Sequence, residues 1–232
     1  MEIQTIRFKL PAGSSVVDLY WPEEAAPTPL VIVAHGFARS RRNMAGWGEH
    51  LAAQGIAAAV PDLPAWSNHP RNGRFISQLK ATLCSEETTM HRIDDKRVGF
   101  LGFSAGGLAS LLSAATNPTT AIWVGLDPVD WKAAGTKAAP AVECRALVLT
   151  AEPSACNSHG NASSIIAALP HCEHVQIPGA VHVDAEWPTD WLAEVACGRS
   201  SPTPRSEFRQ RATAALRESL GLQPAIGSES PD

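Results

Sequence analysis

The chain has 232 residues, of which 44% are hydrophobic and 18% charged, with a formal net charge of −4 at pH 7. This length suits a single globular domain, and the small negative charge gives no reason to expect nucleic acid as a partner. No apolar run approaches the roughly 20 residues that cross a bilayer, so we expect no membrane insertion. The first residues lack a basic segment followed by an apolar one. We therefore expect a cytoplasmic location. A secreted or periplasmic location would need a leader outside this sequence. A homodimer is a possible assembly.

Strand-like and helix-like segments alternate along most of the chain, which predicts an α/β fold. The expected sheet is mostly parallel, with about eight strands and helices on both faces. The expected strands are 3–10 and 15–21 as an antiparallel pair, then 30–34, 56–61, 98–103, 121–126, 146–151 and 174–177. The expected helices are 43–54, 75–90, 104–115, 161–168 and 189–197, with a loop over 65–74.

We assign residues 1–198 to this catalytic domain and residues 199–232 to a C-terminal segment. That segment is expected to hold a linker, a helix over 205–220 and a disordered tail from 223. The connection over 127–145 is short, so the sequence leaves no room there for a lid domain. We expect an open site.

The most informative motif is Gly102-Phe103-Ser104-Ala105-Gly106, which follows an apolar strand and precedes a helix of small residues. This G-x-S-x-G pattern is typical of a nucleophile elbow, a sharp turn from strand to helix that presents a serine. Glycines are needed beside such a turn because a Cβ would collide with the neighbouring chain. The motif predicts Ser104 as a nucleophile.

A serine hydroxyl needs a base to accept its proton and a carboxylate to orient that base. His182 lies in a loop of small residues after the last predicted strand, which makes it the expected base. Three carboxylates follow strand ends: Asp127 and Asp130 after the sixth strand, and Glu152 after the seventh. We favour Asp127, which leaves its strand directly and is stiffened by a following proline, and Glu152 stays the main alternative.

Two backbone amides are expected to form an oxyanion hole, which binds the negatively charged oxygen of a tetrahedral intermediate. One belongs to Ala105, the residue after the nucleophile. The other belongs to Phe37, in the His35-Gly36-Phe37 loop after the third strand. We expect the His35 side chain to hold this loop rather than to take part in chemistry.

These motifs together resemble the α/β-hydrolase superfamily over about residues 1–198. The resemblance is to its chlorophyllase and dienelactone-hydrolase-like branch, and the chain is similar to platelet-activating-factor acetylhydrolases and polyester-cleaving esterases. In the chlorophyllases and acetylhydrolases the acid follows the sixth strand in a Leu-Asp-Pro or Leu-Asp-Ala setting, which matches Leu126-Asp127-Pro128. The resemblance therefore implies Asp127 as the acid. The chain has Ala105 where chlorophyllases carry arginine and Ser104 where dienelactone hydrolases carry cysteine, which argues against their particular substrates.

Seven tryptophans stand out in a chain with one tyrosine. We expect Trp66, Trp131, Trp187 and Phe103 to line the substrate pocket, since each lies near a predicted catalytic residue or loop. The other candidates for substrate contact are the basic residues after the oxyanion loop. A solvated face is the simpler role for Arg39, Arg41 and Arg42.

The five cysteines match no metal-binding spacing. We expect reduced, partly buried thiols, with a Cys156–Cys172 or Cys156–Cys197 bridge as the alternative in an oxidising compartment.

The sequence thus predicts a lidless serine hydrolase that cleaves small carboxylic esters and needs neither metal nor organic cofactor. An acyltransferase or a thioesterase would use the same triad. A catalytically inactive protein that binds ligands through this fold is the alternative from another class.

Overall fold

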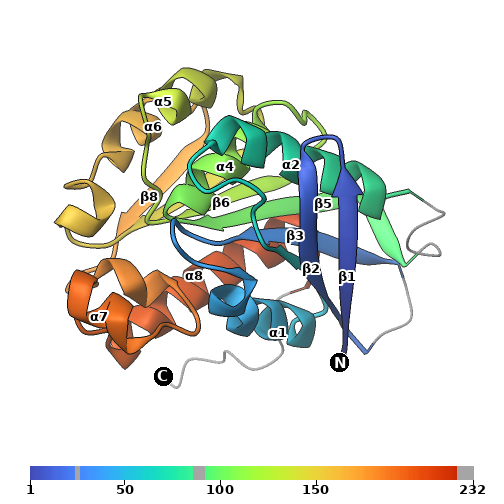
Figure 1. Ribbon diagram of the computed structural model, residues 1–232, viewed down its shortest axis with the longest axis horizontal. Helices are drawn as coiled ribbons and strands as arrows, with labels where there is room; N and C mark the ends of the chain where they lie inside the picture. Colours follow the sequence, from blue (N-terminus) through green and yellow to red (C-terminus); the bar gives the residue numbers. More distant parts are fainter. Residues whose placement is uncertain (24–26, 86–91, 224–232) are drawn as a thin grey trace.

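An eight-stranded sheet forms the centre of the computed structural model, which describes residues 1–23, 27–85 and 92–223 (Figure 1). The strand order is β1-β2-β4-β3-β5-β6-β7-β8. Neighbours from β4 onward pair in parallel, while β1, β2 and β4 pair antiparallel. The strands are β1 (Glu2–Leu10), β2 (Gly13–Trp21), β3 (Thr28–Ala34), β4 (Ala57–Pro61), β5 (Ile93–Phe103), β6 (Ile122–Leu126), β7 (Arg145–Thr150) and β8 (Cys172–Gln176). The predicted α/β fold is confirmed.

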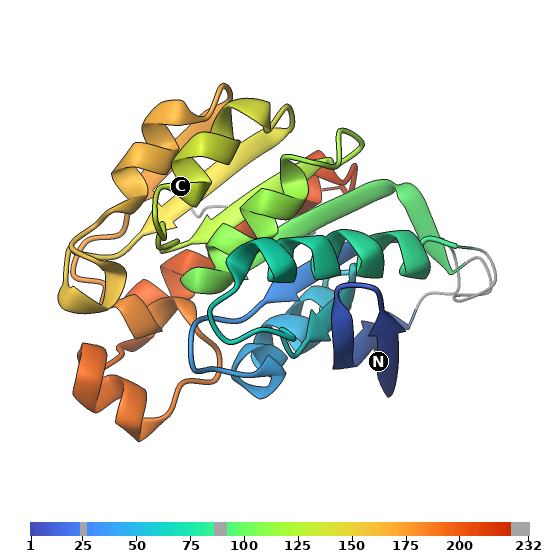
Figure 2. The same cartoon turned by 45° about the horizontal axis from the view of Figure 1, so that its top comes forward.

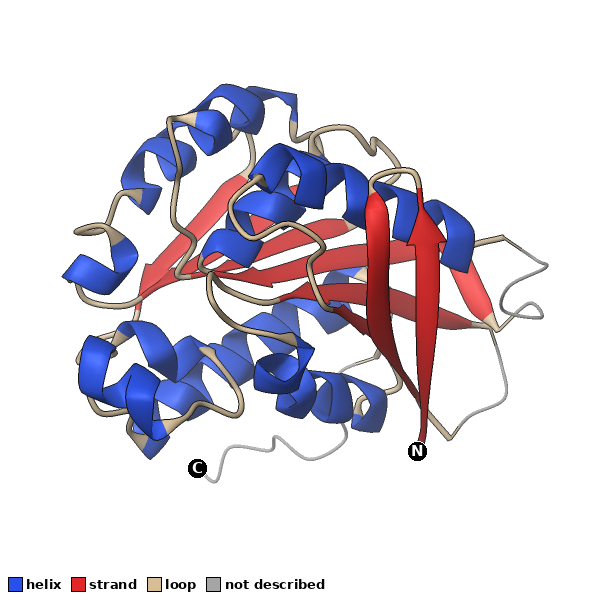
Figure 3. Ribbon diagram, viewed as in Figure 1, coloured by secondary structure: helices blue, strands red, loops and turns tan. Residues whose placement is uncertain are grey.

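Helices cover both faces of the sheet (Figure 3). The α-helices are α1 (Ala45–Ala53), α2 (His69–Leu83), α4 (Ala105–Ala114), α5 (Ala134–Ala138), α6 (Ala162–Ala168), α7 (Trp191–Cys197) and α8 (Pro202–Ser219). The 3-10 helices are η1 (Arg41–Met44), η2 (Ala139–Ala141), η3 (Ala155–Asn157) and η4 (His182–Ala185). In the described ranges no helix has both the length and the apolar character needed to cross a membrane.

Alternation along the strands divides the apolar core into two layers. In β3, Leu30 and Ile32 face the layer that α2 and α4 cover, whereas Val31 and Val33 face the layer beneath α1 and α8. A strand buried on both faces needs an unbroken apolar sequence, as in β4, β6 and residues 98–103 of β5. Trp47 of α1 is fully buried in the second layer.

The start of α2 and the place of the C-terminal helix α8 differ from the sequence-based expectation. Helix α2 begins at His69, within the stretch 65–74 that we predicted as a loop. Its start is stabilised by Asn68, whose side chain accepts a hydrogen bond from the Arg71 N–H. The expected end of this helix, at 86–90, lies outside the described residues, as does the tail from 224. Helix α8 places Phe208 and Leu216 in the second core layer, so it is part of the same folded unit.

The carboxyl ends of the parallel strands meet at one edge of the sheet, where an α/β fold places its ligand site. Each predicted catalytic segment follows a strand at this edge. The connection between β6 and β7 holds α5 and η2, with no inserted domain. Residues 127–144, which the structure describes throughout, therefore form no lid domain at this connection.

Candidate active site

Ser104 lies at the turn between β5 and α4, with φ 54° and ψ −122°. A positive φ is rare for a residue with a side chain and marks a strained, functionally used turn. The flanking glycines make the turn sterically possible. A Cβ at Gly102 would lie 2.3 Å from the carbonyl oxygen of Gly106, and one at Gly106 would lie 2.4 Å from that of Ala34. The elbow predicted from the motif is present.

Three side chains form a hydrogen-bonded line at the strand ends. His182 Nε2 lies 3.0 Å from Ser104 Oγ, and His182 Nδ1 lies 2.6 Å from Asp127 Oδ2. Ser104 follows β5, Asp127 follows β6 and His182 begins η4 after β8. Because a carboxylate can only accept, Nδ1 carries the proton and Nε2 presents its lone pair to the serine hydroxyl. All three side chains are buried, which shields this line from bulk water.

Asp127 is held by two further donors. The Ala151 N–H donates to Oδ1 at 3.1 Å, and the Asn157 side-chain amide donates to Oδ2 at 3.0 Å. Asn157 is buried in η3 and also donates to the Glu152 carbonyl oxygen. Our sequence analysis did not identify Asn157. Its one local signal is the Ser154-Ala155-Cys156-Asn157 spacing, in which Asn157 Oδ1 accepts from the Ser154 N–H.

The two other candidate acids have different partners. Glu152 is exposed and accepts from Gln176 Nε2 and the Gly179 N–H, which ties β7 to the loop after β8. Asp130 accepts from the Gly135 and Thr136 N–H groups at the start of α5. Neither carboxylate has a hydrogen bond to His182 in the described part of the chain.

The expected oxyanion hole lies where the loop after β3 contacts the elbow. A Cβ at Gly36 would lie 3.2 Å from Ser104 Cβ, so the loop approaches the nucleophile closely. The N–H groups of Phe37 and Ala105 donate to no other group among the residues described here. Two amides without protein acceptors beside a serine hydroxyl are suited to stabilising an oxyanion.

The His35 side chain holds this loop. Its Nε2 accepts from the Leu63 N–H at 2.9 Å, so Nδ1 carries the proton and donates to the Gly36 carbonyl oxygen at 2.8 Å. Burial lowers the pKa of His35 from its ordinary value of 6.5, which keeps the ring neutral. The structural role that we predicted for His35 agrees with these contacts.

Ion pairs hold two of the three arginines for which we expected a solvated face, and the third, Arg42, is exposed as expected. Arg39 makes a two-pronged contact with the fully buried Glu186, with both distances 2.6 Å, and a further bond to Asp190. The Arg39 pair joins the oxyanion loop to the segment after His182. Arg41 contacts Asp18 and Asp62. The charges of Arg39 and Arg41 are therefore paired with carboxylates of the chain itself.

Aromatic side chains line the open cleft in front of Ser104. Phe37, Trp66 and Trp131 are 51%, 71% and 54% exposed, and the rings of Phe37 and Trp66 meet edge to face with centroids 5.0 Å apart. A cavity of about 450 Å³ is bounded by these three side chains together with Ser104. A smaller cavity of about 250 Å³ continues from it along the oxyanion loop. Trp66 and Trp131, two of the predicted pocket residues, thus line the cleft in front of Ser104.

Two of the predicted pocket residues lie elsewhere. Trp187 packs against Gly46, where a Cβ would come within 2.4 Å of the indole, and beneath the Arg209 guanidinium. Phe103 is buried under the His182 ring, with centroids 4.7 Å apart. Trp187 supports α1 and α8, and Phe103 supports the base, so neither lines the cleft.

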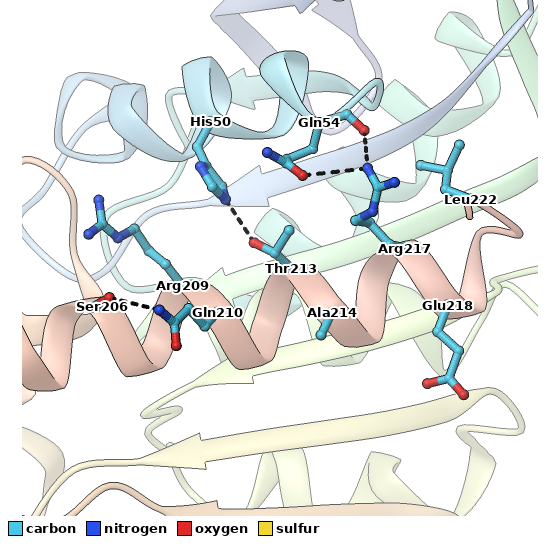
Figure 4. Close-up of a pocket in the computed structure, with 10 residues that line it drawn as sticks. All are labelled: His50, Gln54, Ser206, Arg209, Gln210, Thr213, Ala214, Arg217, Glu218 and Leu222. Atoms are coloured by element: carbon cyan, nitrogen blue, oxygen red, sulfur yellow. Dashed lines mark hydrogen bonds between the residues drawn. The ribbon is translucent and has the colours of Figure 1, made fainter. Parts of the chain in front are cut away.

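A larger cavity, of about 950 Å³, lies between α1 and α8 (Figure 4). Its walls carry His50, which bonds to Thr213, and Arg217, which donates to the Gln54 carbonyl oxygen. None of the predicted catalytic residues lines this cavity. Size alone therefore does not identify the site.

A disulfide joins Cys156 of η3 to Cys197 at the end of α7. The expectation of five reduced thiols is wrong, and the alternative Cys156–Cys197 pairing is present. Cys84, Cys144 and Cys172 are free. Burial raises the pKa of Cys144 and of Cys172 to about 11, so these two stay protonated thiols at neutral pH. Within the described ranges, no cluster of three or more His, Cys, Asp and Glu side chains could hold a metal ion.

Comparisons with known proteins place the chain in a family. The PET hydrolase-like family model matches residues 1–187. A bis(hydroxyethyl) terephthalate hydrolase of Streptomyces coelicolor is 28% identical over 137 residues, which cover 58% of this chain and 43% of that protein. The quorum-quenching protein AidA of Acinetobacter baumannii is 28% identical over 106 residues, 43% of this chain and 35% of that protein. The aligned segments therefore span less than half the length of these two relatives.

Among solved structures, a dienelactone hydrolase from Anabaena variabilis matches with a TM-score of 0.74 and 19% identity. The match covers 94% of this chain and 97% of that one, and it shows the shared fold. The α/β-hydrolase fold, the strained serine elbow and the match over residues 1–187 lead to one conclusion. The chain belongs to the PET hydrolase-like family, a family of ester hydrolases.

Proposed function

We propose that this protein hydrolyses carboxylic esters through an acyl-enzyme on Ser104. The observation that carries the proposal is the Asp127–His182–Ser104 line, with its 2.6 Å and 3.0 Å separations, beside the two unpaired amides of Phe37 and Ala105. Acyl transfer requires a base whose lone pair points at the hydroxyl, and N–H donors that are free to bind the oxyanion.

In the proposed reaction, His182 Nε2 takes the Ser104 proton as Oγ bonds to the ester carbonyl carbon. The carbonyl oxygen becomes an oxyanion that the Phe37 and Ala105 N–H groups stabilise. His182 then passes the proton to the alcohol oxygen, the C–O bond breaks, and the acyl group stays on Ser104. Water then attacks the acyl carbon as His182 takes its proton, and His182 returns that proton to Ser104 Oγ as the bond from the acyl carbon to Oγ breaks, which releases the carboxylic acid and the free serine.

The substrate class that best fits the cleft is a small ester of an aromatic acid. Phe37, Trp66 and Trp131 offer exposed ring surface around Ser104, and aromatic rings pack well against one another. The Streptomyces coelicolor relative is named for the hydrolysis of bis(hydroxyethyl) terephthalate. We propose an ester of this type, which water would cleave to a monoester and ethylene glycol.

The disulfide bears on the compartment in which the protein works. The disulfide favours a compartment that keeps cysteines oxidised. We therefore propose that the protein works in an oxidising compartment rather than in the cytoplasm.

Steady-state kinetics test the activity. We expect the protein to hydrolyse 4-nitrophenyl butyrate and bis(2-hydroxyethyl) terephthalate, and Ser104→Ala to lower kcat/KM by at least about 10,000-fold. Ser206→Ala, a serine substitution on α8 at the far cavity, serves as the matched control and should retain activity. Equal rates for Ser104→Ala and the natural protein would contradict the proposal.

A further inference from the structure

Among the described residues, the His69 side chain has no hydrogen-bonding partner, and it lies at the cleft in front of Ser104. Its side chain is 6% exposed, and it lines both the cavity in front of Ser104 and the smaller one along the oxyanion loop. In the described part of the chain neither ring nitrogen makes a hydrogen bond, and Nδ1 is completely enclosed. Buried polar groups are nearly always paired, so an unpaired imidazole at a cleft requires an explanation.

The fold places this ring beside the nucleophile. Helices α2 and α4 run parallel along one face of the sheet (Figure 2). Gly73 of α2 fits against Leu112 and Ala109 of α4, and Ser77 Oγ lies 2.9 Å from Ser113 Oγ further along. This register brings the first residue of α2, His69, alongside the first turn of α4, which begins at Ala105.

The surroundings of the ring determine what it can bind. An enclosed N–H without an acceptor is the costlier arrangement, so the proton is best placed on Nε2, the nitrogen that is not enclosed. Nε2 is then a hydrogen-bond donor. The ring stands at the N-terminus of the 15-residue helix α2, whose dipole also favours an electron-rich group. The Trp131 and His69 rings meet edge to face, with centroids 6.5 Å apart.

We infer that His69 is a substrate-binding residue that donates a hydrogen bond from Nε2 to a second carbonyl or carboxylate oxygen of the ester. This inference rests on the proposed function and narrows its substrate class to esters with such an acceptor away from the bond that is cleaved. Esters of aromatic dicarboxylic acids have this feature, and simple benzoates lack it. Burial lowers the pKa of His69, so the ring acts as a neutral donor at neutral pH.

Matched substrates test this role. We compare 4-nitrophenyl benzoate with the 4-nitrophenyl ester of monomethyl terephthalate, which adds only the distal ester, in the natural protein, His69→Phe and His69→Gln. One neutral hydrogen bond is worth about 0.5–1.5 kcal/mol, so the kcat/KM preference for the terephthalate should fall by about two- to tenfold in His69→Phe. The change should appear mainly in KM, and His69→Gln, which keeps an N–H donor, should recover most of the preference. An unchanged preference in His69→Phe, with both esters still hydrolysed, would overturn the role of His69 and leave the proposed function standing.

A second measurement does not depend on turnover. In the Ser104→Ala protein, monomethyl terephthalate should shift the imidazole ¹⁵N signal of His69 Nε2, and methyl benzoate should shift it less. Equal shifts with the two probes, or none, would contradict the inference. If the natural protein hydrolyses neither ester, the proposed function fails, and this titration still decides whether His69 binds the acceptor.

Discussion

In the proposed mechanism, Asp127 is the residue on which the chemistry of the site depends most. It leaves β6 with a positive φ of 42° and accepts hydrogen bonds from Ala151, Asn157 and His182. Asn157 comes from the η3 turn after β7, so two successive strand ends cooperate to fix one carboxylate. This arrangement orients the imidazole with its lone pair on Ser104.

Replacing this carboxylate should disable the base. In Asp127→Asn the amide can donate to His182 Nδ1 and so favour the wrong tautomer, and we expect kcat to fall about 10,000-fold. Glu152→Gln is the matched control, because Glu152 is exposed and contacts Gln176 and Gly179 instead. Steady-state kinetics on 4-nitrophenyl butyrate measure both. A severe loss in Glu152→Gln with an active Asp127→Asn would show that the acid comes from β7.

At the residue scale, local motifs singled out Ser104 and His182, the acid stayed open between Asp127 and Glu152, and residues held by distant contacts were not predictable. Ser104 and His182 lie in short signatures that follow strands, so their positions depend on nearby sequence. Asn157 reaches Asp127 across 30 residues, and no local pattern specifies that contact. Trp187 follows the His182 loop, but its direction is set by Gly46 and Arg209, which are distant in sequence.

At the scale of elements, an ion pair joins the two loops that build the site. Arg39 follows the oxyanion loop and Glu186 follows η4, so their contact fixes the Phe37 amide relative to His182. Burial raises the pKa of Glu186, and the Arg39 guanidinium opposes this rise. A buried carboxylate that loses its counter-charge is strongly destabilising.

Removing the arginine should therefore cost stability. We expect Arg39→Met to lower the free energy of unfolding by about 3–5 kcal/mol near neutral pH, less in acid where Glu186 can take up a proton. Arg145→Met is the control, because Arg145 pairs with Glu173 and Glu218 at the exposed surface and should contribute below about 1 kcal/mol. Urea unfolding measures both. Equal losses in the two variants would show that the buried Arg39–Glu186 pair contributes no more to stability than an exposed pair.

Elements were predictable where apolar patterning is strong. The strands of the sheet were identified from apolar runs, and their ends differ from the expectation by a few residues. The start of α2 was missed because residues 65–74 are rich in polar residues and proline, which suggest a loop. In the structure Asn68 caps the helix, and Pro70 occupies its first turn, where the N–H that proline lacks would have no partner within the helix.

At the scale of the whole molecule, buried histidines link stability to pH. Burial lowers the pKa of His35, His50 and His69 from the ordinary value of 6.5. As the pH falls below about 6.5, the unfolded chain takes up protons that these folded side chains do not, so the native state loses stability. Above that pH the three groups contribute no further change.

Urea unfolding between pH 7.5 and 5.5 should show this loss. We expect the free energy of unfolding to decrease towards pH 5.5, and the decrease to be smaller in His50→Gln, whose amide can keep a bond to Thr213. Glu186 acts in the opposite direction, since its raised pKa favours protonation in the folded state. A free energy of unfolding that rises towards pH 5.5 would mean that the histidines do not dominate.

The fold of the whole chain was largely predictable, and the limits of its folded unit were not. The alternation of elements specified the parallel sheet, and the short connection over 127–145 left no room there for an inserted domain. The expected boundary at residue 198 marks no division between cores, because α8 buries Phe208 and Leu216 against the sheet. The charged face of α8 concealed this apolar stripe in the sequence.

The central claim is that Ser104 forms a covalent bond with an acyl-like electrophile, assisted by His182. Intact-mass spectrometry after treatment with a 4-nitrophenyl alkylphosphonate, followed by peptide mapping, tests it directly. We expect one phosphonyl group per chain on Ser104, with the label absent in Ser104→Ala and formed far more slowly in His182→Ala. An unlabelled protein, or labelling at another residue while Ser104 stays free, would contradict the account.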